Sequence, residues 1–176
     1  SNGETITMTM LSRQIAGEGG TFSSGMAPTI ARSLGLVLSF KNIWSGFGFS
    51  VSESGYTSLS IRGNGVEILA GRARVGFNAE DNTPEVAEIL EGVSEVTIEA
   101  PDGFVPGKYY YVQFFPQTMP LGFTAQLKSP SRVGTFVYSN SRRFARSIWT
   151  RVSDLDSRCS IEETGTPPND EIWYST

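Results

Sequence analysis

Apolar and polar residues alternate with a period of two over much of the chain. Residues 5–10 read Thr-Ile-Thr-Met-Thr-Met, and similar alternation recurs at 34–40, 47–51, 56–62, 96–100, 123–127 and 133–138. Successive side chains of a β-strand point to opposite faces, so this pattern predicts strands that bury one face. Short turns separate the segments. Together they predict an all-β fold, an antiparallel, jelly-roll-like β-sandwich of about nine strands.

Two glycine-containing turns are expected to close hairpins. Residues 53–55, Glu-Ser-Gly, separate the strands expected at 47–51 and 56–62. Residues 63–65, Gly-Asn-Gly, follow the second of these strands, and an Asn-Gly pair readily adopts positive φ. Each turn is therefore predicted to join two neighbouring strands of one sheet.

One short segment has the spacing of a helix. Thr83 can cap it, Pro84 suits the first helical position, and Gly92 can end it. An apolar stripe and an acidic face complete the pattern, formed by Val86, Ile89 and Leu90 and by Glu85, Glu88 and Glu91. The sequence therefore predicts one short helix near residues 84–91.

Three segments lack a clear period. Residues 17–28 form a glycine- and serine-rich loop, which is a candidate contact loop or flexible arm. Residues 139–155 are compatible with helix or strand, and an extended form is slightly favoured. The chain from about residue 160 is expected to be an irregular tail, because Pro167 and Pro168 oppose regular structure. With no repeat or change in composition, residues 1–176 are predicted to form a single domain.

The composition is that of a folded domain with a modest charge. Apolar residues make up 39% and charged residues 18%, and the net charge of −4 gives no general attraction to nucleic acid. No apolar run is long enough for a membrane-spanning helix, and the first residues lack the pattern of a signal peptide. Cys159 has no partner within the chain, so it is expected to be a small, partly buried apolar side chain.

The absence of histidine excludes several classes of chemistry. A Ser-His-Asp triad, a Cys-His pair and a histidine-ligated metal all need an imidazole. One cysteine cannot build a structural zinc site, and no glycine-rich nucleotide loop is present. No cofactor and no metal site are expected. Hydrolysis of a saccharide by two carboxyl groups remains an alternative, with candidates among Glu95, Glu99, Asp102, Asp154 and Asp156.

The most aromatic stretch of the chain, KYYYVQFFP at residues 108–116, offers a candidate binding face. A strand here places Tyr110, Val112 and Phe114 on one side, which we expect to face the core. Tyr109, Tyr111 and Gln113 then share the other side. Because tyrosine and glutamine combine surface area with a hydrogen-bonding end, this second face is a candidate contact surface for a ligand or a subunit.

An arginine cluster is the strongest local charge feature. It consists of Arg142, Arg143, Arg146, Arg151 and Arg158. Guanidinium groups suit phosphate, sulfated or sialylated sugars, or an acidic partner surface. The first three, Arg142, Arg143 and Arg146, are the candidate ligand-binding arginines. The alternative is an ion-pair network on the surface or between subunits, partly neutralised by Asp154 and Asp156.

These features predict a non-catalytic binding or assembly domain. Few charges, no disulfides and many Thr, Ser and Gly residues are typical of a glycan- or receptor-binding or structural module. Such modules occur in phage or viral fibres, spikes and capsids and in bacterial adhesins, so the expected location is extracellular or on a virion. The expected partners are a glycan or protein surface and further copies of the chain, as in the trimers that such virion domains often form. A carbohydrate-active enzyme with paired carboxylates is the alternative.

Overall fold

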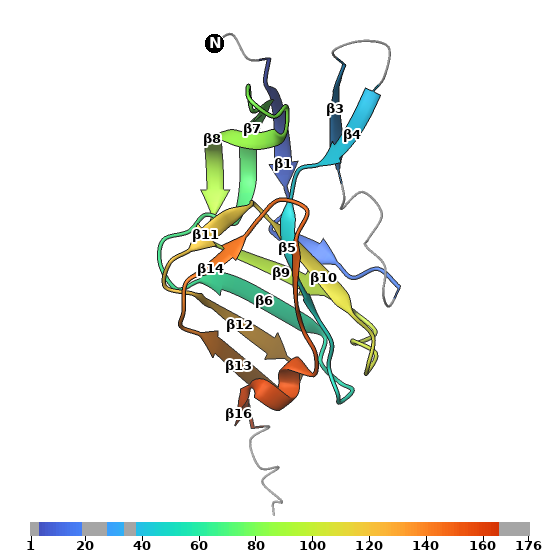
Figure 1. The fold of residues 1–176 in the computed structure, drawn as a ribbon. Helices are drawn as coiled ribbons and strands as arrows, with labels where there is room; N and C mark the ends of the chain where they lie inside the picture. Colours follow the sequence, from blue (N-terminus) through green and yellow to red (C-terminus); the bar gives the residue numbers. More distant parts are fainter. Residues whose placement is uncertain (1–3, 19–27, 34–37, 166–176) are drawn as a thin grey trace, which may run out of the picture.

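Two β-sheets packed face to face form the body of the protein (Figure 1). The computed structural model describes residues 4–18, 28–33 and 38–165. The larger sheet has the order β16 (Ser160–Glu163), β13 (Arg132–Tyr138), β12 (Phe123–Lys128), β6 (Ser58–Gly63), β9 (Glu95–Glu99), β2 (Arg13–Ile15). The smaller sheet has the order β10 (Tyr110–Phe114), β5 (Ser45–Phe49), β15 (Trp149–Val152). The predicted all-β, sandwich-like fold is confirmed.

The core lies between these two sheets. Phe47 of β5 meets Phe123 of β12 edge to face, with ring centroids 5.5 Å apart. The inward positions of both sheets are almost fully buried, among them Phe49, Leu59, Ile61, Val96, Ile98, Val112, Phe114, Ala125 and Leu127. The two-residue alternation in the sequence therefore identifies the core-facing side of the central strands correctly.

The sandwich departs from the expected strand count and direction. The described residues contain sixteen strands, more than the nine or so expected, because segments with little alternation also form short pairs. Two pairs are parallel: β15 with β5, and β2 with β9. All other pairs in the described part of the chain are antiparallel, as predicted.

Smaller β elements join the body. One is a sheet of β1 (Ile6–Met10), β7 (Ala70–Phe77) and β8 (Pro84–Val93). Another is the hairpin of β3 (Thr29–Ser33) and β4 (Leu38–Asn42). Both project from the same end of the sandwich, at the top of Figure 1. A third pair, β11 (Gln117–Met119) with β14 (Arg142–Phe144), lies beside the sandwich.

The helix predicted near residues 84–91 is wrong, because this segment is β8, an antiparallel partner of β7. Two register shifts in the ladder leave Ala87 and Leu90 without an opposite residue. Each bulge adds one residue to β8, so residues that share a face recur every three positions instead of every two. The spacing that resembles a helix is that of a twice-bulged strand.

The acidic side of β8 is explained by the same register. Glu85, Glu88 and Glu91 lie opposite alternate residues of β7, so they share one face of the sheet. Glu88 pairs with Arg74, and Glu91 pairs with Arg72 at 2.9 Å. Cross-strand pairs of opposite charge stabilise a ladder modestly. The glutamates that were expected on a solvated helix face are therefore partners within a sheet.

Neither glycine turn closes the predicted hairpin. β5 and β6 belong to different sheets, so the chain crosses from the smaller to the larger sheet between residues 50 and 57. β6 is followed by β7, which pairs with β1 and β8 and not with β6. A glycine turn reverses the chain locally, but which layer each strand joins depends on the core that it buries.

The remaining ambiguous segments are short strands and a single turn of helix. Residues 142–155 contain β14 and β15, which agrees with the favoured extended form, and a 3₁₀ turn spans Leu155–Arg158. The tail expected from about residue 160 begins instead with β16, which pairs with β13. Most of the loop at 17–28, part of the strand expected at 34–40 and residues 166–176 lie outside the described residues. No helix in the described ranges is long and apolar enough to cross a bilayer.

Candidate functional site

Strand β10 divides its side chains between the core and the outer face of the smaller sheet. Tyr110, Val112 and Phe114 are buried, which confirms the predicted core face. The ring of Tyr110 packs against Phe49 and Phe104. Its hydroxyl oxygen accepts a hydrogen bond from the backbone N–H of Val105 at 2.9 Å, so its polar end is satisfied inside the core.

The outer face carries four side chains in contact, which we call the aromatic platform: Tyr109, Tyr111, Trp149 and Arg151. The rings of Tyr109 and Tyr111 stack with centroids 6.5 Å apart. The Arg151 guanidinium lies over both, at 5.6 Å from the Tyr109 centroid and 5.4 Å from that of Tyr111. Trp149 meets Tyr111 edge to face at 5.5 Å. The predicted outer face is thus an ordered array of three rings and one cation.

Two glycines of β5 bring this array together. Tyr111 of β10 and Arg151 of β15 lie on either side of Gly48, in one row across the sheet. A Cβ atom at Gly48 would lie 2.9 Å from the Tyr111 ring, so its absence lets the two flanking side chains meet above the strand. In the next row, the Trp149 ring occupies the space that a Cβ atom at Gly46 would need.

Gln113 is not exposed with the tyrosines. It is fully buried, and neither side-chain amide atom has a hydrogen-bond partner. Its backbone is held by Gln14 of β2, whose amide donates to the Gln113 carbonyl at 2.7 Å and accepts from the Gln113 N–H at 2.9 Å. The side-chain amide of Gln14 thus forms the two hydrogen bonds that the backbone of a neighbouring strand would form at this edge of β10. The alternation correctly predicts which face of the strand Gln113 occupies. The prediction that its side chain is exposed on that face is wrong.

The arginine cluster divides between two hollows. Arg142 and Arg143 are neighbours in β14 and line different hollows. Arg143 and Arg146 line one of about 490 Å³, together with the acidic side chains of Asp81 and Glu85. This mixed-charge hollow is not a uniform anion site. The three candidate arginines therefore do not form one patch.

Arg142 instead joins Arg151 and Arg158 in what we call the arginine hollow. This hollow has a volume of about 320 Å³. Its other lining residues are aromatic, aliphatic or hydroxyl-bearing, with no acid among them: Phe123, Phe136, Tyr138, Thr150 and Val152. Arg142 donates to Thr150 Oγ1 at 3.0 Å, and Arg158 Nε donates to the Ser153 carbonyl at 3.2 Å. Arg151 connects the hollow with the aromatic platform.

These three arginines take no part in the ion pairs of the described residues. Those pairs join Arg13 to Glu99, Arg72 to Glu91, Arg74 to Glu88 and Arg132 to Glu53. Within the described part of the chain, an internal ion-pair network therefore does not account for Arg142, Arg151 and Arg158.

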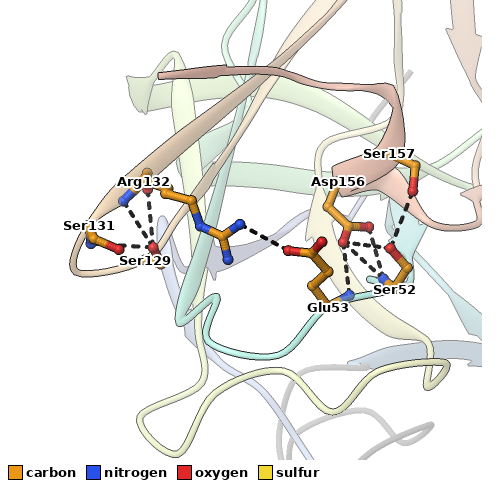
Figure 2. A network of polar contacts seen from close by, with 7 residues as sticks. All are labelled: Ser52, Glu53, Ser129, Ser131, Arg132, Asp156 and Ser157. Atoms are coloured by element: carbon orange, nitrogen blue, oxygen red, sulfur yellow. Dashed lines mark hydrogen bonds and ion pairs between the residues drawn. The ribbon is translucent and has the colours of Figure 1, made fainter. Parts of the chain in front are cut away.

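Asp156, one of the two acids expected to neutralise the cluster, has other partners. Figure 2 shows the Asp156 carboxylate directed at the turn of Ser52 and Glu53. It accepts hydrogen bonds from Ser52 N at 2.9 Å, Ser52 Oγ at 2.8 Å and Glu53 N at 2.9 Å. Arg132 pairs with Glu53 at 2.9 Å, and its guanidinium lies over the Tyr56 ring. The network ties the crossover between the sheets to the turn of Leu155–Arg158.

Asp156 has the protonation behaviour of a structural carboxylate. Burial acts to raise its pKa, but the hydrogen bonds from Ser52 and Glu53 outweigh that effect and hold the pKa below its usual range. A general acid for glycoside hydrolysis needs the opposite shift. Another candidate, Glu99, forms a 2.7 Å ion pair with Arg13. Neither geometry favours the paired-carboxylate alternative.

Cys159 is partly buried beside this network. Burial, together with the negative charge of Asp156, raises its thiol pKa to about 11. The thiol donates a hydrogen bond to the Leu155 carbonyl, with Sγ 3.2 Å from the oxygen. A protonated, internally bonded thiol is a poor nucleophile at neutral pH. Among the described residues, no group of three potential metal-ligating side chains occurs.

Sequence reasoning missed the glycines that shape the platform and the full set of side chains around the hollow. Gly46 and Gly48 alternate with Phe47 and Phe49, so one face of this strand lacks side chains entirely. This alternation of glycine and phenylalanine could have been recognised in the sequence as a strand with one bare face. By contrast, Trp149 and Arg151 reach the tyrosines only through the parallel pairing of β15 with β5, which alternation does not specify.

Comparisons with protein families, curated proteins and solved structures find no significant match for this chain. A functional proposal therefore depends on the geometry of the aromatic platform and the arginine hollow.

Proposed function

We propose that the protein is a non-catalytic domain that binds a saccharide on the aromatic platform. The observation that carries this proposal is the position of Arg151 above the stacked rings of Tyr109 and Tyr111. A sugar ring has apolar C–H faces and polar edges. Tyrosine and tryptophan rings complement the faces, while hydroxyl and guanidinium groups supply hydrogen bonds to the edges.

The construction of the platform suits recognition rather than packing within the chain. Tyr109 and Tyr111 are only partly buried, and Arg151 is exposed. Mutual stacking and the cation–π contacts restrict the side chains before any ligand arrives, so less conformational entropy is lost on binding. Tyr111, Trp149 and Arg151 also stand on paired strands, which hold side chains more rigidly than a loop does.

A glycan array followed by calorimetric titration tests this proposal. We expect Tyr109→Ala to weaken binding of the best saccharide roughly 10-fold, because truncating an aromatic contact residue typically costs 1–2 kcal/mol or more. The melting temperature should not change, since Tyr109 contributes little to the core. Leu121→Ala, which shortens an exposed apolar side chain in another turn, is the control.

Two results would contradict saccharide binding at the platform. One is that no saccharide of a broad panel binds. The other is that Tyr109→Ala and Leu121→Ala bind the selected saccharide as tightly as the unmodified protein.

Self-assembly is a second candidate function, favoured by the projecting hairpin of β3 and β4. Leu38 is 57% exposed and Phe40 is 68% exposed, and alternation along β4 places both on one side. A two-stranded hairpin is only marginally stable by itself. Burial of these two side chains against a second copy of the chain would stabilise it, in agreement with the homo-oligomer expected from the sequence.

A further inference from the structure

The arginine hollow lies directly beside the aromatic platform, and Arg151 belongs to both. We propose that this hollow binds a carboxylate or sulfate group carried by the saccharide, so that the ligand is an acidic saccharide. This inference rests on the proposed function in taking the ligand to be a saccharide. The platform would contact a sugar ring, and the hollow would hold the anionic substituent of the same or the next ring.

Three arginines from separate elements line the hollow. Arg142 comes from β14, Arg151 from β15 and Arg158 from the last position of the 3₁₀ turn. Among the described residues, no carboxylate lines the hollow, although the whole chain has a net charge of −4. Three arginines around one concave surface favour the binding of an anion there.

The arginines have donor capacity left for a ligand. Each guanidinium offers five N–H groups. The Arg142 contact with Thr150 and the Arg158 contact with Ser153 each use one nitrogen and a neutral acceptor. Arg142 Nε is buried and has no partner. Because Arg142 Nε has no access to the hollow, an oxyanion would instead form charge-assisted bonds with the terminal guanidinium nitrogens of Arg142 and Arg158.

The lining also favours an anion over a neutral group. Phe136 and Tyr138 form part of the wall, and aromatic walls reduce the access of water to the charges. Thr150 and Ser153 hold two guanidinium groups in place, so little side-chain entropy is lost when an anion binds. The mixed-charge hollow provides an internal contrast, because Asp81 and Glu85 there offset Arg143 and Arg146.

The experiment uses the full chain and three oligosaccharides of matched length. One carries carboxylates as uronic acids, one carries sulfates, and one is neutral. Binding is measured by calorimetry at low and at physiological salt for the unmodified protein and for Arg142→Gln and Arg158→Gln. Arg143→Gln is the matched control, because it removes the same charge from the adjacent residue, which lines the other hollow.

We expect at least one acidic oligosaccharide to bind more tightly than the neutral one. Arg142→Gln and Arg158→Gln should each weaken acidic binding about 10-fold or more, as the loss of a charge-assisted contact predicts. Arg143→Gln should leave it unchanged, and none of the three variants should alter neutral binding. Which acidic probe responds identifies the substituent as carboxylate or sulfate.

Two outcomes would overturn the inference. One is equal affinity for acidic and neutral probes. The other is an equal loss in Arg142→Gln and Arg143→Gln, which indicates general charge attraction. If Arg142→Gln fails to fold, Arg158→Gln still tests the inference. Arg158 is exposed, so its substitution should leave the fold intact.

If the proposal of saccharide binding at the platform is wrong but the inference about the hollow is right, the result differs from these two outcomes. Acidic probes would then depend on Arg142 and Arg158 while Tyr109→Ala had no effect. If only the hollow fails, Tyr109→Ala still weakens binding of neutral and acidic probes alike.

Discussion

Asp156 shows how one side chain can join distant parts of the chain. Its carboxylate is buried and bonded to the backbone N–H groups of Ser52 and Glu53 and to the Ser52 hydroxyl (Figure 2). These residues lie where the chain crosses from one sheet to the other. A residue that looked like a candidate acid in the sequence is therefore a structural anchor.

We expect Asp156→Asn to destabilise the fold by about 1–3 kcal/mol at pH 7, because it weakens the charge-assisted bonds that the carboxylate accepts from Ser52 and Glu53. Asp154→Asn is the control: Asp154 is exposed, and asparagine tolerates its positive φ of 48°. Urea unfolding gives the free energies. Equal stability of the two variants would contradict the anchor role.

The pH dependence of that difference follows from the lowered pKa of Asp156. The carboxylate contributes its stability above the pKa of an aspartate in the unfolded chain, about 4, and loses it as the pH falls through the lower folded value. The gap between unmodified protein and Asp156→Asn should therefore shrink as the pH falls below about 4. If the stability difference between the two proteins instead grew as the pH fell, the pKa of Asp156 would be raised and not lowered by folding.

At the residue scale, the sequence predicts which face of the strand each side chain of KYYYVQFFP occupies, but it does not predict how exposed that side chain is. Tyr110, Val112 and Phe114 are buried as alternation requires. Gln113 has the parity of the platform tyrosines and is nevertheless fully buried, at the edge that Gln14 closes. Alternation reports which side of a strand a residue occupies. It does not report what covers that side.

The strand β5 is the element that shapes the platform. Its glycines at positions 46 and 48 leave space for side chains from both neighbouring strands to meet above it. Its phenylalanines fill the core on the opposite face. One short strand thus contributes to the core on one face and forms the floor of the candidate site on the other.

We expect Gly46→Ala to disturb the platform, because the new Cβ atom would collide with the Trp149 ring and lie 2.5 Å from the Val112 carbonyl oxygen. Overpacking of this kind typically costs about 1–3 kcal/mol. Saccharide binding should weaken as well. Gly165→Ala is the control, because a Cβ atom there meets nothing within 4 Å. Retention of both stability and binding by Gly46→Ala would show that the ring moves aside without consequence.

Strand β8 shows why an element can be assigned to the wrong type. Its two bulges repeat every three residues, and a period of three is close to the 3.6 residues of a helical turn. The register with β7 is what distinguishes the two forms. In that register, Arg72 lies opposite Glu91 and Arg74 lies opposite Glu88, and the sequence alone does not specify these pairs.

At the scale of the whole molecule, the projecting hairpin of β3 and β4 is the feature that most needs a partner (Figure 1). If a second copy covers it, the protein should form a dimer or higher oligomer at micromolar concentration. Phe40→Ser should shift it toward the monomer. Val66→Ser is the control, since Val66 is 94% exposed and lies outside any strand. Sedimentation velocity that shows a monomer for all three proteins would exclude this assembly.

The sequence by itself determined the all-β class, the core side of the central strands and the exclusion of histidine chemistry. These follow from composition and from a two-residue period, which depend only on neighbouring positions. The tertiary structure decided which strands pair, where bulges occur and which charged side chains meet. Arg151 reaches Tyr109 and Tyr111 across Gly48, and Arg142 and Arg143 line different hollows. The contact of Arg151 with the tyrosines joins residues far apart in the chain, and it depends on which strands pair and not on neighbouring positions.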